Sequence, residues 1–242
     1  MGSGSSASRG VAQLVLLDNR FATLPEVLAQ GRKVINNIER VANLFVTKAT
    51  YAMLLTAIIG IQGIEFPFLP RQLTLIGTFS IGLPGMVLAL APNTNLVRPG
   101  FLSRVARFSI PAGTVAAIAT WFVYLYARDG ADDTIDPHQL ADARSGATLT
   151  LLGIGLVVLV VVSRPLRVWK IALAAAMGLL YSALMILDRS REYFELTVPD
   201  ADVWTACALA VSASGILIVA VPVLVPGLRL MPAPSSDTRS TR

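Results

Sequence analysis

The sequence has 242 residues, of which 54% are hydrophobic and only 14% are charged. An ordinary soluble domain carries about 25% charged residues, so this composition excludes a soluble fold and also a disordered chain. The single cysteine, Cys207, excludes a disulfide within the chain. The net charge of +5 must be interpreted from the positions of the basic residues.

Six apolar stretches are long enough to cross a bilayer, whose core of about 30 Å requires roughly 20 residues of helix. Short polar segments rich in Pro, Gly, Asn and Asp separate them. The stretches are Leu44–Ile61, Gln72–Leu90, Phe108–Ala127, Ala147–Ser163, Val168–Leu187 and Val203–Val225. The sequence therefore predicts an all-α membrane protein with a six-helix transmembrane domain over residues 44–227 and a disordered cytoplasmic tail over residues 228–242.

Charged residues are sorted between the two ends of these helices. The side that holds both termini carries fourteen basic and four acidic residues, and the other side carries five basic and eleven acidic residues. Because basic loops stay in the cytoplasm, we expect both termini there and a multi-pass protein in the plasma membrane. This pattern predicts the lipid bilayer as the partner, and no nucleic acid.

The segment before the first span has two local patterns. Val11–Leu17 is an apolar run followed by turn residues, which is typical of a short buried strand. Thr23 and Glu26 have the spacing of a capping box, and Pro25 is tolerated in the first turn of a helix. The segment is therefore expected to be folded.

Apolar residues at three- and four-residue intervals continue from Pro25 into the first span. This periodicity predicts one helix from Pro25 to Ile61, roughly 55 Å long at 1.5 Å per residue, whose residues 25–43 form a cytoplasmic stalk. The alternative is a helix lying flat on the membrane, because Arg32, Lys33 and Arg40 suit anionic lipid.

Four runs of residues resemble a known family. They are Met1–Ala7, Val15–Thr23, Gly31–Ile38 and, in the second span, Gly82-Leu83-Pro84. In this order and spacing they resemble the end of the phosphorylation domain, the stalk and the following spans of cation-transporting P-type ATPases. Within that family, Thr47–Tyr51 is most similar to actinobacterial pumps associated with calcium uptake.

The resemblance implies a domain organisation. Residues 1–24 would be the end of the HAD-like phosphorylation domain, and the predicted strand would be a remnant of that domain. The six spans would be the fifth to the tenth of the pump. The chain would then be its C-terminal membrane half, as a fragment, a split-gene product or an excised piece. The resemblance also assigns four residues to the coupling stalk: Gly31, Arg32, Asn36 and Asn37.

The family motifs for ATP hydrolysis do not occur in the sequence. These are Asp-Lys-Thr-Gly-Thr around the phosphorylated Asp, Gly-Asp-Gly-x-Asn-Asp for magnesium and Thr-Gly-Glu of the actuator. We therefore expect no ATP hydrolysis by this chain alone and no cofactor in it. The resemblance implies ATP and Mg for the complete pump. It also implies a partner that supplies the first four spans and the actuator, nucleotide and phosphorylation domains.

Lys48 lies about four residues inside the first span, where an ionisable side chain is a candidate functional residue by default. Thr47, Thr50 and Tyr51 are its neighbours on the helix and complete this part of a candidate ion path. The alternative is that the ammonium extends to the nearby interface and has no role in transport.

The second span supplies the other part of the candidate ion path. Pro84 has no N–H, so the Ser80 carbonyl loses its helical partner. That oxygen lies in sequence beside the hydroxyls of Thr78 and Ser80, with Gly82 giving room, and oxygen ligands suit a hard cation. Plain kinking of a packed helix is the alternative.

The sequence departs from the animal-type calcium pumps of the family at the ligand positions. Ile81 stands where those pumps have Asp, and Ala49 and Ala52 stand where they have Asn and Glu. The six predicted spans contain no Asp or Glu. The metal ligands and the identity of the ion are therefore open. A self-sufficient six-helix carrier or channel, or a non-transporting membrane fragment, are the rival functions.

Overall fold

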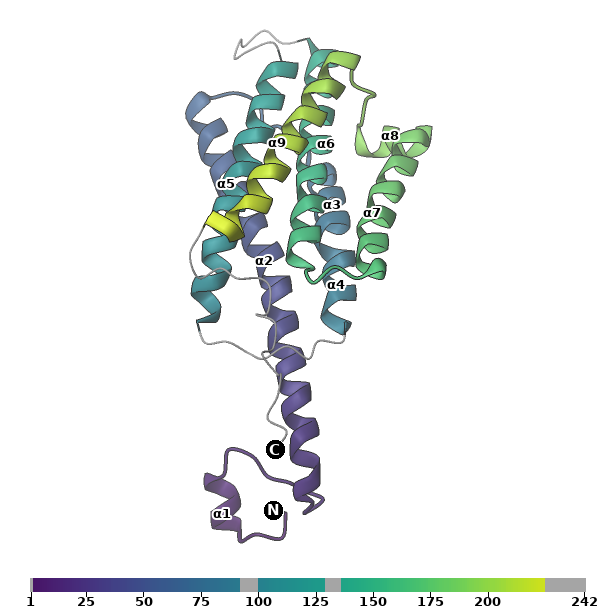
Figure 1. Cartoon of the computed structure of the whole chain (residues 1–242). Coiled ribbons are helices and arrows are strands. Elements are labelled where there is room, and N and C mark those ends of the chain that lie inside the picture. Colours follow the sequence, from purple (N-terminus) through teal and green to yellow (C-terminus); the bar gives the residue numbers. More distant parts are fainter. Residues whose placement is uncertain (1, 92–99, 129–135, 225–242) are drawn as a thin grey trace, which may run out of the picture.

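The computed structural model describes residues 2–91, 100–128 and 136–224, which form helices joined by short connections (Figure 1). The predicted tail at residues 228–242 lies outside this part of the chain. In order the elements are α1 (Ser6–Val11), the 3-10 helix η1 (Phe21–Thr23), α2 (Leu24–Gln62), α3 (Pro70–Gly77), the π-helix η2 (Thr78–Gly82), α4 (Leu83–Leu90), α5 (Phe101–Ala127), α6 (Pro137–Val162), α7 (Val168–Ile186), α8 (Asp188–Phe194) and α9 (Ala201–Leu224).

The long helix predicted from Pro25 to Ile61 is confirmed as α2. Its 39 residues span about 58 Å at 1.5 Å per residue, and its first half extends below the other helices (Figure 1). The helix ends at Gly63, which has a φ of 69° and donates its N–H to the Ile59 carbonyl at 3.0 Å. Glycine adopts this left-handed conformation without the steric penalty of a side chain.

Two predictions for the segment before α2 are wrong. The capping box does not form, because the Thr23 hydroxyl donates to the Arg20 carbonyl at 2.7 Å instead of accepting from the first turn. The strand at 11–17 does not form either, and Val11 instead ends the short helix α1. A strand needs a neighbouring strand for its backbone groups, and the described residues include none.

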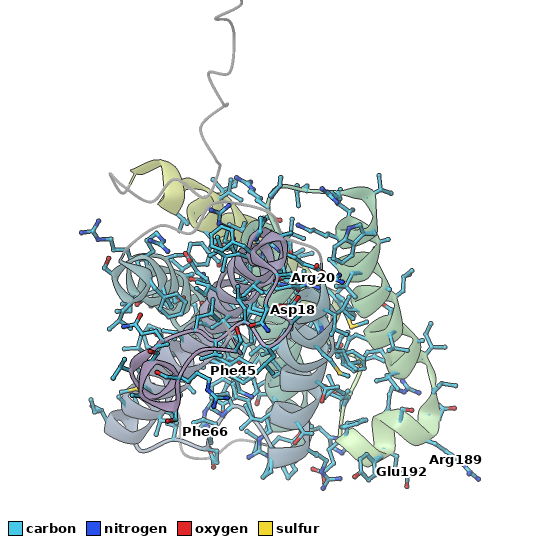
Figure 2. The ribbon with its side chains drawn as sticks, turned by 90° about the horizontal axis from the view of Figure 1, so that it is seen from below. Asp18, Arg20, Phe45, Phe66, Arg189 and Glu192 are labelled. Carbon is cyan, nitrogen blue, oxygen red and sulfur yellow. The ribbon has the colours of Figure 1, made fainter. Side chains whose placement is uncertain are left out.

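Six helical segments have the length and hydropathy needed to cross a membrane, as predicted. The second consists of α3, η2 and α4, which follow one another without a gap. Two of the helices begin earlier than predicted, α5 at Phe101 and α6 at Pro137, because their polar first turns continue the helix beyond the apolar run. The short helix α8 was not predicted, and its residues Arg189 and Glu192 lie at the edge of the bundle (Figure 2).

The helices α5 and α6 form the centre of the bundle. They pack on each other and on α9, while α2 packs on α5, and α7 lies at the edge beside α6 (Figure 1). Small residues allow these close contacts, among them Ala112 and Ala117 of α5 and Ala147 of α6, all with 0% exposure. The closest approach is at Gly113 of α5, where a β-carbon would lie 2.5 Å from the Thr50 Cβ of α2.

A polar clamp joins the helices at the end opposite the stalk. Glu65, in the connection after α2, forms an ion pair with the buried Arg128 at the end of α5. The Tyr124 hydroxyl donates to the Glu65 carbonyl at 2.7 Å, and the Arg144 Nε of α6 donates to the Phe66 carbonyl at 3.3 Å. The hydrogen bond from Arg128 holds the pKa of the Glu65 carboxyl below its ordinary value.

The close contact at Gly113 predicts that Gly113→Ala separates α5 from α2. The added methyl would lie 2.9 Å from the Thr47 carbonyl as well, and backbone cannot move aside cheaply. Overpacking of this kind lowers the free energy of unfolding by about 1–3 kcal/mol. Denaturant titration of the chain in detergent measures the change. Gly60→Ala on exposed α2 surface, with nothing within 4 Å, is the control and should cause no loss.

The lowered pKa of Glu65 predicts a dependence of stability on pH. A carboxyl whose folded pKa lies below its unfolded value stabilises the fold fully above the unfolded pKa, and this stabilisation is lost as the pH falls through the folded pKa. Glu65→Gln should therefore lower the melting temperature at neutral pH and flatten its decline in acid. Equal acid sensitivity of the variant and the parent chain would contradict this assignment.

Candidate functional site

Lys48 of α2 lies against the start of the π-helix in the second span. The contact is made at Gly77, where a β-carbon would lie 2.8 Å from the Lys48 Nζ. The ammonium therefore occupies space that a side chain at this position would fill. Among the described residues, Lys48 has no hydrogen bond or ion pair, and its side chain is half-buried. The structure thus places an uncompensated positive charge beside the irregular part of the second span.

The π-helix, Thr78–Gly82, accommodates the missing N–H of Pro84. Its hydrogen bonds span five residues instead of four, as in the bond that the Leu83 N–H donates to the Thr78 carbonyl. Pro84 itself lies in the first turn of α4, where a proline fits. π-helical turns inside α-helices are frequent at functional sites.

The serine and threonine hydroxyls predicted for the ion path each donate to the carbonyl four residues earlier. The donor–acceptor distances are 2.7 Å for Thr47, 2.8 Å for Thr50, 2.8 Å for Thr78 and 2.7 Å for Ser80. Since each hydroxyl proton is engaged by backbone, only the oxygen lone pairs face outward. These groups can therefore accept a hydrogen bond or coordinate a cation but cannot donate to a third group.

The structure does not gather all of these residues at one point. Thr47 and Thr50 contact Gly113 of α5, and Ser80 contacts Gly155 of α6, where a β-carbon would lie 3.2 Å from the Ser80 Oγ. Thr78 and Gly82 are exposed on the outside of the bundle. Lys48 approaches the second span at Gly77, the residue before the π-helix.

Tyr51 is buried one turn beyond Lys48, and no partner for its hydroxyl exists among the described residues. A buried, unpartnered hydroxyl is costly in an apolar environment. The described residues contain no group of three or more His, Cys, Asp or Glu side chains that could hold a metal. The hydroxyls of Thr47, Thr50 and Ser80 offer neutral oxygens only.

The stalk residues have different environments. Gly31 and Arg32 are exposed, whereas Asn36 is half-buried and Asn37 is buried with 2% exposure. The Asn37 amide donates to the Ala89 carbonyl at 2.9 Å and to the Ala91 carbonyl at 2.7 Å, at the end of α4. Asn37 thus ties the stalk to the second span.

Two further contacts fix the stalk to α5. The Arg104 guanidinium binds both carboxylate oxygens of Glu39 at 2.9 and 2.7 Å, and the Ser109 hydroxyl lies 3.1 Å from the Asn43 Oδ1. The sequence analysis did not identify these residues. A signal for Asn43 was present, because the buried polar residues of α2 recur at helical spacing: Asn37, Arg40, Asn43 and Thr47. The pairing of Glu39 with Arg104, 65 residues away, had no local signal.

The buried amide of Asn37 predicts that Asn37→Leu weakens the attachment of the stalk. The carbonyls of Ala89 and Ala91 would lose their donor, which should lower the free energy of unfolding by about 1 kcal/mol. Denaturant titration in detergent measures this. Arg32→Leu, at an exposed position of the same stalk, is the control. A loss as large in the control would contradict a specific role for Asn37.

The chain is similar in sequence to known proteins. No protein-family model matches the chain. The chain is 42% identical over 231 residues to the "Calcium-transporting ATPase CtpE" of Mycolicibacterium smegmatis, which covers 91% of the chain and 29% of that protein. The protein of the same name from Mycobacterium tuberculosis is 44% identical over 225 residues, 89% of the chain and 28% of its own length.

A more distant relative matches half of the chain. The "Probable cation-transporting ATPase exp7" of Streptococcus pneumoniae is 34% identical over 134 residues, 52% of the chain and 17% of that protein. The chain thus spans less than a third of the length of the curated relatives it matches. On the strength of matches over about nine-tenths of its residues, the chain belongs to the cation-transporting P-type ATPases and corresponds to their C-terminal part.

Proposed function

We propose that this chain is the C-terminal membrane part of an ATP-driven cation pump that transports calcium. The observation that carries the proposal is its 42% and 44% identity to proteins named as calcium-transporting ATPases. The six apolar helices and the long α2 support it, since they supply a membrane domain and a stalk. The excess of basic residues on the stalk side supports a plasma-membrane orientation with both termini in the cytoplasm.

ATP hydrolysis in the complete pump would depend on residues outside this sequence. The chain contains none of the motifs that bind ATP, Mg or the phosphoryl group, so those cofactors would act on the partner half. This chain would contribute the ion path and the stalk that transmits motion to it. The contacts of Asn37 with α4 and of Glu39 with Arg104 support that coupling role.

The partner half would cover an apolar groove on the stalk. The groove has a volume of about 420 Å³ and lies on α2 beside the end of α4. Val34, Ile38 and Phe45 are 53%, 53% and 55% exposed there. Exposed apolar surface of this extent typically marks an interaction site. The remaining spans and domains of the pump are the partner that this surface would pack against.

The ion path would run between α2 and the π-helix, beside Lys48. A fixed ammonium near a cation site repels the cation and lowers its affinity, which favours release. The neutral oxygens of Thr47, Thr50 and Ser80 can supply ligands but no negative charge. The carboxylates that calcium prefers would therefore come from the partner half.

Lys48→Ala in the complete pump tests this role for the charge. Removing the repulsion should lower the half-saturating calcium concentration by about tenfold, equivalent to about 1.4 kcal/mol. Lys48→Arg keeps the charge and should leave the value near that of the parent. Calcium-dependent ATPase activity of the pump in membrane vesicles measures both.

Gly77→Ala is a second variant that moves the ammonium without removing it. Its methyl group would occupy the position 2.8 Å from the Lys48 Nζ, so the calcium dependence should shift in this variant too. Gly85→Ala, in the same span with nothing within 4 Å, is the matched control. Unchanged calcium dependence in both Lys48→Ala and Gly77→Ala would leave Lys48 with an interfacial role only.

Calcium flux through the purified chain alone tests the pump against a carrier. In liposomes the chain without its partner half should show no ATP-driven accumulation and no carrier-type exchange. Saturable calcium exchange by the chain alone would overturn the assignment as part of a pump and favour a self-sufficient carrier. Co-expression with the partner half should restore ATP-driven uptake.

A further inference from the structure

Three cationic side chains gather where the stalk meets the connection between α6 and α7: Arg40, Arg167 and Lys170. Arg40 and Lys170 are buried, with 8% and 5% exposure. The Arg40 Nη2 donates to the Arg164 carbonyl at 3.5 Å, which joins α2 to the connection. The Lys170 Nζ donates to the Ser163 carbonyl at 2.5 Å and to the Pro165 carbonyl at 3.0 Å.

This cluster has no negative charge of its own. None of the three side chains forms an ion pair with a carboxylate among the described residues. Glu39, adjacent to Arg40 in sequence, is engaged by Arg104 of α5. Arg40, Arg167 and Lys170 are close enough for their charges to repel one another. Buried like charges without a counter-charge are costly, so the cluster is electrostatically incomplete.

The first turn of α7 adds to the positive potential at the same place. This 19-residue helix begins at Val168, directly after Arg167, and no side chain caps its first N–H groups. The N-terminus of a helix carries a partial positive charge and unpaired N–H donors, which together favour an anion. The first turn of α7, Arg167 and Lys170 thus all contribute positive potential beside the α6–α7 connection.

Apolar residues surround the cluster and identify the source of the anion. Leu166 and Val168 are 45% and 85% exposed, and Trp169 is 36% exposed. The Lys170 Nζ lies 5.6 Å from the centre of the Trp169 ring. Tryptophan beside basic residues is typical of the level of lipid headgroups, where the apolar side chains face acyl chains. A free anion in water would not require this apolar rim.

We propose that this cluster binds the phosphate of an anionic phospholipid in the leaflet on the stalk side. The lipid headgroup would lie between α2 and the start of α7 and supply the counter-charge that Arg40 and Lys170 lack. Its acyl chains would cover Leu166 and Val168. The bound lipid would thereby link the stalk to the α6–α7 hairpin.

Native mass spectrometry of the whole chain tests this proposal. The chain is released from micelles that contain equal amounts of phosphatidylglycerol and phosphatidylcholine, and phosphatidylglycerol should be the lipid retained. Each basic residue near a membrane surface contributes about fivefold to the binding of anionic lipid, so Arg167→Gln should reduce retention by about fivefold. Arg167 is exposed, so this variant is expected to fold.

Arg189→Gln is the matched control, because it removes an exposed arginine from α8, at the end of the bundle away from the stalk (Figure 1). Retention should be unchanged in this variant. Equal losses in the two variants, or equal retention of the two lipids, would overturn the proposal. Displacement of phosphatidylglycerol by millimolar inorganic phosphate would show that the cluster binds free phosphate and not lipid.

Discussion

A buried polar group is costly unless a partner within the protein satisfies it. In the stalk half of α2 the polar side chains that face the bundle are held by backbone carbonyls and a few side chains of α4 and α5. The amide of Asn37, the carboxylate of Glu39 and the amide of Asn43 have such contacts. These bonds are directional, and they fix the rotation of α2 about its axis. The position of every other residue on α2, including Lys48, follows from that rotation.

Hydropathy was sufficient to predict the six spanning helices, because a helix that crosses the bilayer core needs an apolar run of about 20 residues. It could not predict what depends on neighbours. Val11–Leu17 has the composition of a strand, but a strand forms only beside another strand, and none exists among the described residues. The pairing of Glu39 with Arg104 depends on how α2 and α5 pack, which no local pattern reports.

The same division applies to the candidate site. Lys48 could be identified from sequence, because an ionisable residue within an apolar run is rare. Its contact with Gly77 could not, since a glycine that makes room for a neighbour is recognised only when the packing of the two helices is known. Pro84 indicated a disturbed backbone, but its place in the sequence does not specify the π-helix that the structure has at Thr78–Gly82.

The continuity of α2 has a mechanical consequence. The helix has no proline or π-turn between its first turn and Gln62, so the stalk and the first span move as one rod. Asn37, held by the end of α4, lies eleven residues before Lys48, a lever arm of about 16 Å. With its fulcrum at Asn37, a tilt of about 10° at the foot of the rod displaces the Lys48 ammonium by about 3 Å. This is comparable to the 2.8 Å between the Lys48 Nζ and a β-carbon placed on Gly77.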